Sequence, residues 1–181
     1  MVKFTQIPLP RIIASNEKQW YFSFMKLLYI FAIICFSNNS FAKETKTKDF
    51  VLKAITEVFF QHKIEKIDQY FSKDYIQHQP GIPNGLEPFK KYMQSLFKAF
   101  PDYNGEIENI VVEGDMVSIH FSWTGTHQGE FMGVSPTGKT IKRRTADVLK
   151  VSNGLISEHW GIVDQLEMLK SLDLVRSNKP N

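Results

Sequence analysis

Residues 147–160, Asp-Val-Leu-Lys-Val-Ser-Asn-Gly-Leu-Ile-Ser-Glu-His-Trp, read as two β-strands joined by a tight turn. The aliphatic residues on both sides favour strands, and Asn153-Gly154 suits the positive φ values of a two-residue turn. The outgoing strand places Asp147 among apolar neighbours, and the returning strand brings His159 and Trp160 back level with it. Because a buried carboxylate is costly unless it is paired, Asp147 is either a satisfied structural group or a tuned acid/base.

The length of this turn determines which ring faces Asp147. If residues 152–154 form a three-residue loop with a bulge, Asp147 lies opposite His159. If only Asn153-Gly154 forms the loop, Asp147 lies opposite Trp160 instead. A shift of one residue moves every side chain to the other face of the sheet, so both registers stay open; we favour the one with His159.

Upstream of this hairpin, the chain predicts helices first and strands afterwards. Apolar residues at helical spacing indicate a helix over residues 50–59 and a short helix over 64–71. A third, longer helix would begin at a capping box of Asn84 and Glu87 and end at Phe100. A brief strand is expected at residues 75–78. From Tyr103 the period changes to two, which predicts a hairpin around Gly114-Asp115. Asp164 would cap a closing helix, and this order of elements predicts an α+β fold.

Several motifs carry a family resemblance that runs from about Asp49 to Leu174. Besides the Glu158-His159-Trp160 ending of the hairpin, they are Tyr75-Ile-Gln-His78-Gln-Pro80, the glycine-punctuated segment 125–139, and Val163-Asp-Gln-Leu166. Together they resemble the SnoaL-like polyketide cyclases and their ester-cyclase-like members, a branch of the NTF2-like superfamily. Two positions depart from the family pattern, since Gln79 replaces an asparagine and Gly161 replaces an aspartate.

The resemblance implies an NTF2-like cone, in which a curved antiparallel sheet wraps around N-terminal helices and leaves an apolar pocket. It also implies cofactor-free acid/base chemistry on an apolar, carbonyl-containing small molecule, by aldol-type cyclisation or a related isomerisation. Asp147 takes the place of the catalytic acid/base, and His159, His78 and His127 are expected to bind or polarise oxygens. We expect the substrate to contact Trp160, Phe131 and Tyr75.

Each of these residues also has a structural interpretation. Asp147 would be structural if it were bonded to backbone or to a neighbour such as Arg143 or Arg144, whereas a buried, unpaired Asp147 facing a closed cavity would favour an enzyme. In the structural interpretation, His159 is a histidine packed at a sheet edge, and His78 is a loop histidine bonded to backbone. The loop that holds His127 is either a lid over the pocket or a glycine-rich turn at the sheet edge.

Residues 1–42 read as an upstream extension followed by a signal peptide, and residues 43–181 as the domain. Met25-Lys26 is followed by a short apolar core over residues 27–36 and by Ser40-x-Ala42, a small-x-small cleavage pattern, so we expect export to the periplasm or the medium. The core is short for a membrane-spanning helix, which makes an uncleaved anchor the weaker interpretation. Met25 and Met1 are alternative starts. Cleavage after Ala42 would remove Cys35, the one cysteine.

Composition narrows the possible partners. Residues 43–181 hold 18 basic and 18 acidic residues, because residues 1–42 take four basic residues and one acidic residue from the totals of 22 and 19. This balance gives no electrostatic case for nucleic acid, and the run Lys142-Arg143-Arg144 reads as a solvated strand end or as an anion contact at the pocket mouth. We find no sequence motif for a metal site, a nucleotide site or a nucleophile elbow, so no cofactor is expected.

The alternatives to an enzyme are an exported small-molecule-binding domain and a dimeric interaction module. We expect the protein to be a homodimer.

Overall fold

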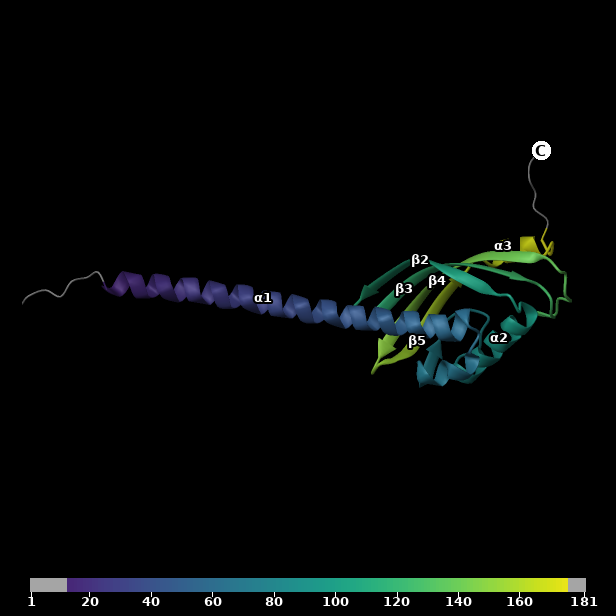
Figure 1. The fold of residues 1–181 in the computed structure, drawn as a ribbon, viewed down its shortest axis with the longest axis horizontal. Coiled ribbons are helices and arrows are strands. Elements are labelled where there is room, and N and C mark those ends of the chain that lie inside the picture. Colours follow the sequence, from purple (N-terminus) through teal and green to yellow (C-terminus); the bar gives the residue numbers. More distant parts are fainter. Residues whose placement is uncertain (1–12, 176–181) are drawn as a thin grey trace, which may run out of the picture. The chain divides into compact units, whose positions relative to one another are not determined.

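The computed structural model describes residues 13–175, and Met1, the alternative start, lies outside them. The elements follow in the order α1 (Ile13–Ala54), η1 (a π-helix, Ile55–Phe60), η2 (a 3-10 helix, Ile64–Gln69), β1 (Phe71–Gln77), α2 (Leu86–Ala99), β2 (Asn104–Glu113), β3 (Met116–Thr126), β4 (Thr140–Ser152), β5 (Leu155–Val163) and α3 (Gln165–Ser171) (Figure 1).

The chain divides into two compact units, residues 1–42 and 43–181, and the backbone of α1 runs through this boundary. The segment expected to be a signal peptide is therefore helical, and its cleavage stays a prediction. Its described side chains include exposed apolar ones such as Leu27 and Phe31. Within the described part of the chain, no helix combines the length and hydropathy needed to cross a membrane.

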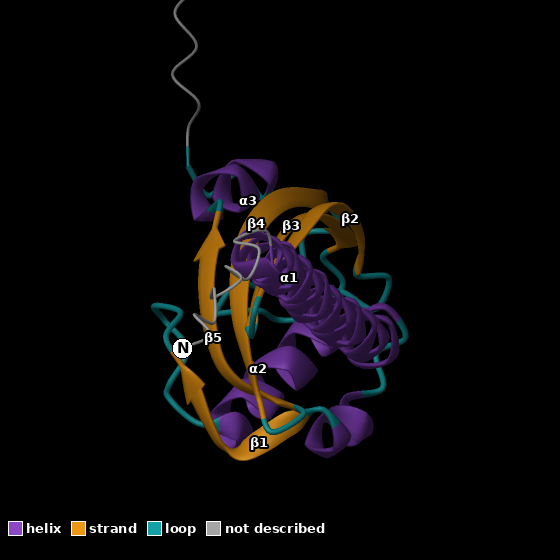
Figure 2. Ribbon diagram, turned by 90° about the vertical axis from the view of Figure 1, so that its left-hand side faces the viewer, coloured by secondary structure: helices purple, strands orange, loops and turns teal. Residues whose placement is uncertain are grey.

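The second unit is built on one five-stranded sheet in the order β1-β5-β4-β3-β2. The edge strand β1 runs parallel to β5, and the other pairs are antiparallel. Figure 2 shows the strands curving around α2. The predicted α+β class is confirmed, as are the Gly114-Asp115 hairpin and the inward face of β3, where four alternate residues are buried: Val117, Ile119, Phe121 and Trp123.

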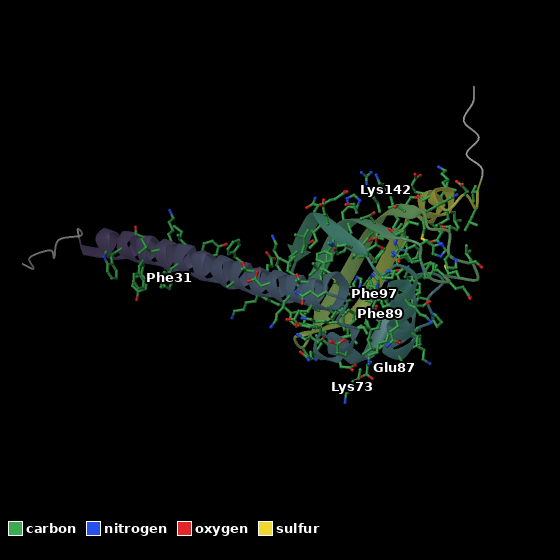
Figure 3. All side chains as sticks on the ribbon, turned by 45° about the vertical axis from the view of Figure 1, so that its right-hand side comes forward. Phe31, Lys73, Glu87, Phe89, Phe97 and Lys142 are labelled. Carbon is green, nitrogen blue, oxygen red and sulfur yellow. The ribbon has the colours of Figure 1, made fainter. Side chains whose placement is uncertain are left out.

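The concave side of the sheet holds the core, which is rich in aromatic rings. The helix α2 buries Phe89, Met93 and Leu96 against it, with Phe97 partly buried (Phe89 and Phe97 are labelled in Figure 3). Rings of four elements meet there, since Phe89 lies 5.9 Å from Phe71 and 6.3 Å from Phe59 between centroids, and 6.0 Å from the ring of His159. Aromatic contacts at these separations add stability beyond area burial, so they hold α2 at a fixed place over the sheet.

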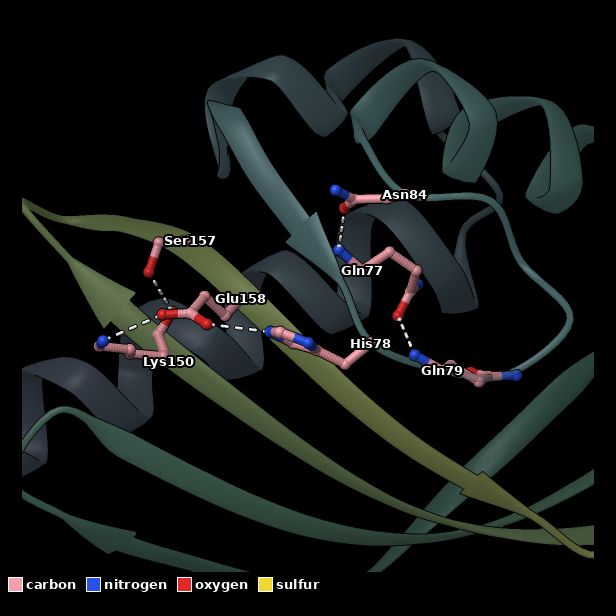
Figure 4. Close-up of polar contacts among 7 residues, drawn as sticks. All are labelled: Gln77, His78, Gln79, Asn84, Lys150, Ser157 and Glu158. Atoms are coloured by element: carbon pink, nitrogen blue, oxygen red, sulfur yellow. Dashed lines mark hydrogen bonds and ion pairs between the residues drawn. The ribbon is translucent and has the colours of Figure 1, made fainter.

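The two expected helix caps have different outcomes. Asp164 caps α3 as predicted, because its Oδ1 accepts the Glu167 N–H at 3.0 Å. The capping box at Asn84 is wrong: α2 begins after Gly85, whose φ of 106° favours glycine, and no side chain caps it. Asn84 Oδ1 instead accepts the backbone N–H of Gln77 at 2.8 Å, where β1 ends (Figure 4).

The last hairpin differs from both expected registers. Its loop is the two-residue one, with φ of 52° at Asn153 and 76° at Gly154. One extra residue, Ser157, then interrupts the ladder, because Val151 pairs with Ile156 but Lys150 pairs with Glu158. This β-bulge shifts all later pairs by one residue, so Asp147 lies opposite Gly161 and Leu149 opposite His159. Asp147 and His159 therefore share the inward face.

Candidate active site

An apolar cavity opens between α2 and the concave face of the sheet. Its volume is about 80 Å³, counted as the space that the centres of water molecules can reach. Most of its lining is aliphatic or aromatic; the polar side chains in the lining are Gln79, Tyr92, Tyr103, Trp123, Arg143, Thr145, Asp147 and His159. A few polar groups converging in an apolar pocket are what a small-molecule site requires.

Asp147 and His159 form the polar centre of this cavity. His159 Nε2 lies 2.8 Å from Asp147 Oδ1, and the two side chains are 9% and 15% exposed. An ionised carboxylate only accepts, so the Nε2–H donates to it. Asp147 Oδ2 accepts the Thr145 hydroxyl at 2.5 Å, and Thr145 Oγ1 in turn accepts the Trp123 Nε1–H at 3.1 Å.

Asp147 is therefore partly buried and paired, and neither Arg143 nor Arg144 is its partner. The condition that would favour an enzyme, a buried and unpaired carboxylate, is not met, because the unit that faces the cavity is an Asp–His pair. Both carboxylate oxygens keep lone pairs available, because each one accepts a single hydrogen bond from the described residues. The pair can consequently still take a proton from a bound molecule.

The two departures from the family pattern meet beside this pair. A Cβ added at Gly161 would lie 2.4 Å from Gln79 Oε1 and 3.1 Å from Asp147 Oδ1. The Gln79 amide therefore occupies the space that a side chain at position 161 would take, and Gln79 lines the cavity. The two substitutions complement each other in shape, and they place an amide at the point where the family pattern has a carboxylate.

His78 and Trp160 lie on the other face of the sheet, outside the cavity. Their rings stack at 4.4 Å with 5° between planes, and His78 Nε2 contacts Glu158 Oε2 at 3.0 Å. Glu158 Oε1 also accepts from Lys150 Nζ at 3.0 Å (Figure 4). Hydrogen bonds from His78 first, then from Lys150, lower the pKa of Glu158. The structure thus does not bring His78 or Trp160 to Asp147, and their expected roles in catalysis and substrate contact stay predictions.

His127 and Phe131 belong to the loop that follows β3, and both rings pack against Phe100. His127 is fully buried, stacks on Phe100 at 5.0 Å and places Nδ1 3.1 Å from Thr137 Oγ1, while its Nε2 has no partner. Phe131 packs against Phe100 at 5.5 Å. Neither residue lines the cavity, and their expected roles in binding the substrate stay predictions.

Tyr75 lies behind the cavity wall. Its ring packs 5.5 Å from Phe89, and its hydroxyl accepts from Gln77 Nε2 at 3.1 Å. Burial, with a smaller contribution from the charge of Asp147, holds the pKa of Tyr75 well above its usual range. Its hydroxyl is therefore a neutral group near the Asp–His pair.

Sequence reasoning left the run that holds Arg143 as either a solvated strand end or an anion contact at the pocket mouth, and it did not single out Arg143. Arg143 is 8% exposed, it lines the cavity, and its Nε donates to the Tyr103 hydroxyl at 2.8 Å. A signal for this position existed, because residues 143, 145, 147 and 149 alternate along one strand and must share the face of Asp147. The exposed neighbours Lys142 and Arg144 concealed it in a run of three basic residues.

Among the described side chains, no group of three or more His, Cys, Asp or Glu could hold a metal ion. The polar groups of the cavity are single hydrogen-bonding side chains around one carboxylate. Such an arrangement can bind a small molecule and exchange a proton with it.

The fold and this site define a class of protein. Residues 49–172 match the model of the SnoaL-like polyketide cyclases, and the chain belongs to that family. The cone with its curved sheet is the NTF2-like fold shared with solved relatives. No curated protein sequence is significantly similar to this chain.

Three solved structures illustrate the similarity. AclR from Streptomyces galilaeus, a proposed hydroxylase, is 27% identical with a TM-score of 0.69, over 76% of this chain and 87% of that one. A proposed polyketide cyclase from Acidithiobacillus ferrooxidans is 30% identical with a TM-score of 0.65, over 72% and 96%. IdmH from Streptomyces antibioticus, also a proposed polyketide cyclase, is 31% identical with a TM-score of 0.61, over 70% and 98%.

Proposed function

We propose that this protein is a cofactor-free acid/base enzyme that acts on an apolar small molecule with a carbonyl group, by aldol-type cyclisation or a related isomerisation. The observation that carries the proposal is the Asp147–His159 pair, 2.8 Å apart, at the wall of an apolar cavity. Family membership supports it, because the matched family is that of polyketide cyclases. Fold alone would not, since one fold serves many functions.

Asp147 would carry both proton transfers. Its carboxylate takes a proton from the carbon next to the substrate carbonyl, which leaves an enolate. The enolate carbon then forms a bond to a second carbonyl carbon, and the oxygen of that carbonyl takes the proton back from the Asp147 carboxylic acid. In an isomerisation, the same acid returns the proton to another carbon. A positioned acid/base of this kind contributes about a hundredfold to ten-thousandfold in rate.

His159 and Thr145 would hold the Asp147 carboxylate in place through both steps. Each donates to one carboxylate oxygen, so the plane of the carboxylate is fixed against the cavity. The apolar lining excludes water from an enolate, which protects it from being protonated by solvent. A competing function, binding without turnover, would use the same cavity and would not need proton transfer.

Conversion of bound ligands separates these two functions. Ligands are first found by thermal-shift screening of apolar ketones and keto esters, and their products are then followed by mass spectrometry. Asp147→Asn keeps the shape of the side chain but cannot exchange a proton at useful rates. Conversion by the wild type that is lost in Asp147→Asn, with binding retained, is the expected result. Equal binding by both proteins with conversion by neither would favour a binding domain.

We further propose that the protein acts outside the cytosol, on the support of the signal-like segment over residues 25–42. A homodimer also stays a prediction, which light scattering of the purified protein tests.

A further inference from the structure

Arg143 is a buried cation in the wall of the cavity. It alternates with the exposed Lys142 and Arg144 on β4, so its side chain points to the concave face while theirs point away (Lys142 is labelled in Figure 3). It stands four residues before Asp147 on the same face, which corresponds to about 13 Å along the strand. The cavity thus has the acid/base at one place and a guanidinium further along the same wall.

The described partners of Arg143 are all uncharged. Its Nε donates to the Tyr103 hydroxyl at 2.8 Å, its guanidinium carbon lies 5.3 Å from the centre of the Tyr103 ring, and Nη1 is 3.9 Å from the sulfur of Met168. The hydroxyl of Tyr92 also interacts with it. Burial holds the pKa of the Tyr103 hydroxyl well above its usual range, so that partner stays a neutral phenol.

No described carboxylate pairs with Arg143. The ion pairs of the second unit involve other residues, and Arg144, the outward neighbour, takes Glu108 at 3.5 Å. Three acids, Glu106, Asp164 and Glu167, line an outer groove that Arg143 also borders, but none lies within 4 Å of its guanidinium. An arginine cannot lose its proton in a protein, and a buried charge without a counter-ion is strongly unfavourable.

We propose that Arg143 binds the carboxylate of an acidic ligand, so that the natural ligand is an apolar carboxylic acid and not its neutral ester. A guanidinium matches a carboxylate geometrically, because two parallel N–H groups meet two oxygens. The aromatic and aliphatic lining holds the rest of the molecule. This inference rests on the proposed function only for the meaning of the ligand as a substrate, since binding itself needs no turnover.

Matched acids and esters test the proposal by calorimetry. The probes are 2-naphthoate with methyl 2-naphthoate, and octanoate with methyl octanoate. The wild type is expected to bind each acid at least tenfold more tightly than its ester. Arg143→Met keeps a long apolar side chain and removes the charge, and it is expected to bring the acid-to-ester ratio close to one. Arg144→Met, the matched control on the outward face of the same strand, should keep the wild-type ratio.

Equal affinity for acid and ester in the wild type, or no detectable acid binding, overturns the proposal even if Arg143→Met does not fold. An acid preference that survives in folded Arg143→Met also overturns it. A purely structural Arg143 would lower the melting temperature on substitution but would leave the ratio unchanged. Asp147→Asn should keep the acid preference, so loss of turnover in that variant leaves this inference intact and bears only on the proposed function.

Discussion

The side-chain amide of Gln79 fills the space beside Gly161, with its oxygen 2.4 Å from where a Cβ at position 161 would lie. The two residues are far apart in the sequence, and the lack of a side chain at Gly161 leaves room for the Gln79 amide. The backbone of Gly161 does not have a positive φ, so an alanine there is limited by space and not by conformation.

Gly161→Ala should therefore displace the Gln79 amide at little cost in stability. The clashing atom is the end of a flexible side chain, and we expect the free energy of unfolding to fall by less than about 1 kcal/mol. Gly129→Ala is the contrasting control, because its Cβ would lie 2.7 Å from the backbone oxygen of Lys98. It should cost about 1–3 kcal/mol. Urea denaturation measures the free energy of unfolding of both variants. Equal losses of stability would contradict the prediction that the Gln79 side chain moves aside.

Asp102 should make the domain sensitive to acid. Its carboxylate accepts the backbone N–H and the hydroxyl of Thr126, each at 2.7 Å, and these bonds, the backbone one first, lower its pKa. A folded-state pKa below the unfolded value of about 4 gives stability that is present above that pH. The stability is lost as the pH falls through the lower folded value.

Asp102→Asn should thus lower the free energy of unfolding at pH 7 and flatten its decline below about pH 4. Chemical denaturation over a pH series measures this. Asp74→Asn, an exposed aspartate on β1, is the control and should follow the wild-type curve. If the free energy of unfolding of Asp102→Asn fell below about pH 4 as steeply as that of the wild type, the Thr126 contacts would contribute nothing to stability.

Trp160→Ala should leave ligand affinity within about twofold, because this ring lies on the outer face of the sheet against His78. The loss of the ring stack should reduce stability by about 1 kcal/mol. Calorimetry with a ligand of the cavity measures the first effect and thermal denaturation the second. A tenfold loss of affinity would instead support the sequence-based expectation that Trp160 contacts the substrate.

Export should yield a mature protein that begins at Lys43, after cleavage that follows Ala42. Mass spectrometry of the periplasmic and secreted fractions reads this end directly. Ala42→Arg, which puts a large charged residue at a position that needs a small one, should leave the longer chain uncleaved. Intact protein starting at Met1 or Met25 in the soluble cytosolic fraction would contradict export.

Much of the fold follows from local patterns. The alternation of β3, the Gly114-Asp115 loop and the Asp164 cap depend on neighbours within a few residues, and all three were predictable. The register of the last hairpin was not, because a bulge at Ser157 leaves no distinctive residue in the sequence. That bulge, more than the turn, brings His159 to the face of Asp147.

The site followed in part from the sequence. The inward position of Asp147 and His159 was expected, whereas Thr145 and Arg143 required the strand alternation to be extended four residues upstream. The meeting of Gln79 and Gly161 depends on how β1 packs beside β5, which is a tertiary contact that no local pattern specifies.

Proton transfer by Asp147 is the central claim, and hydrogen exchange tests it most directly. An apolar ketone that binds the cavity, chosen from those found by thermal shift, is incubated in D₂O with the protein, and NMR follows the hydrogens next to its carbonyl. The wild type should exchange them at least a hundredfold faster than buffer does, and Asp147→Asn should fall to the buffer rate while it binds the ketone equally well. Exchange that continues unchanged in Asp147→Asn would remove Asp147 from the chemistry and contradict the account.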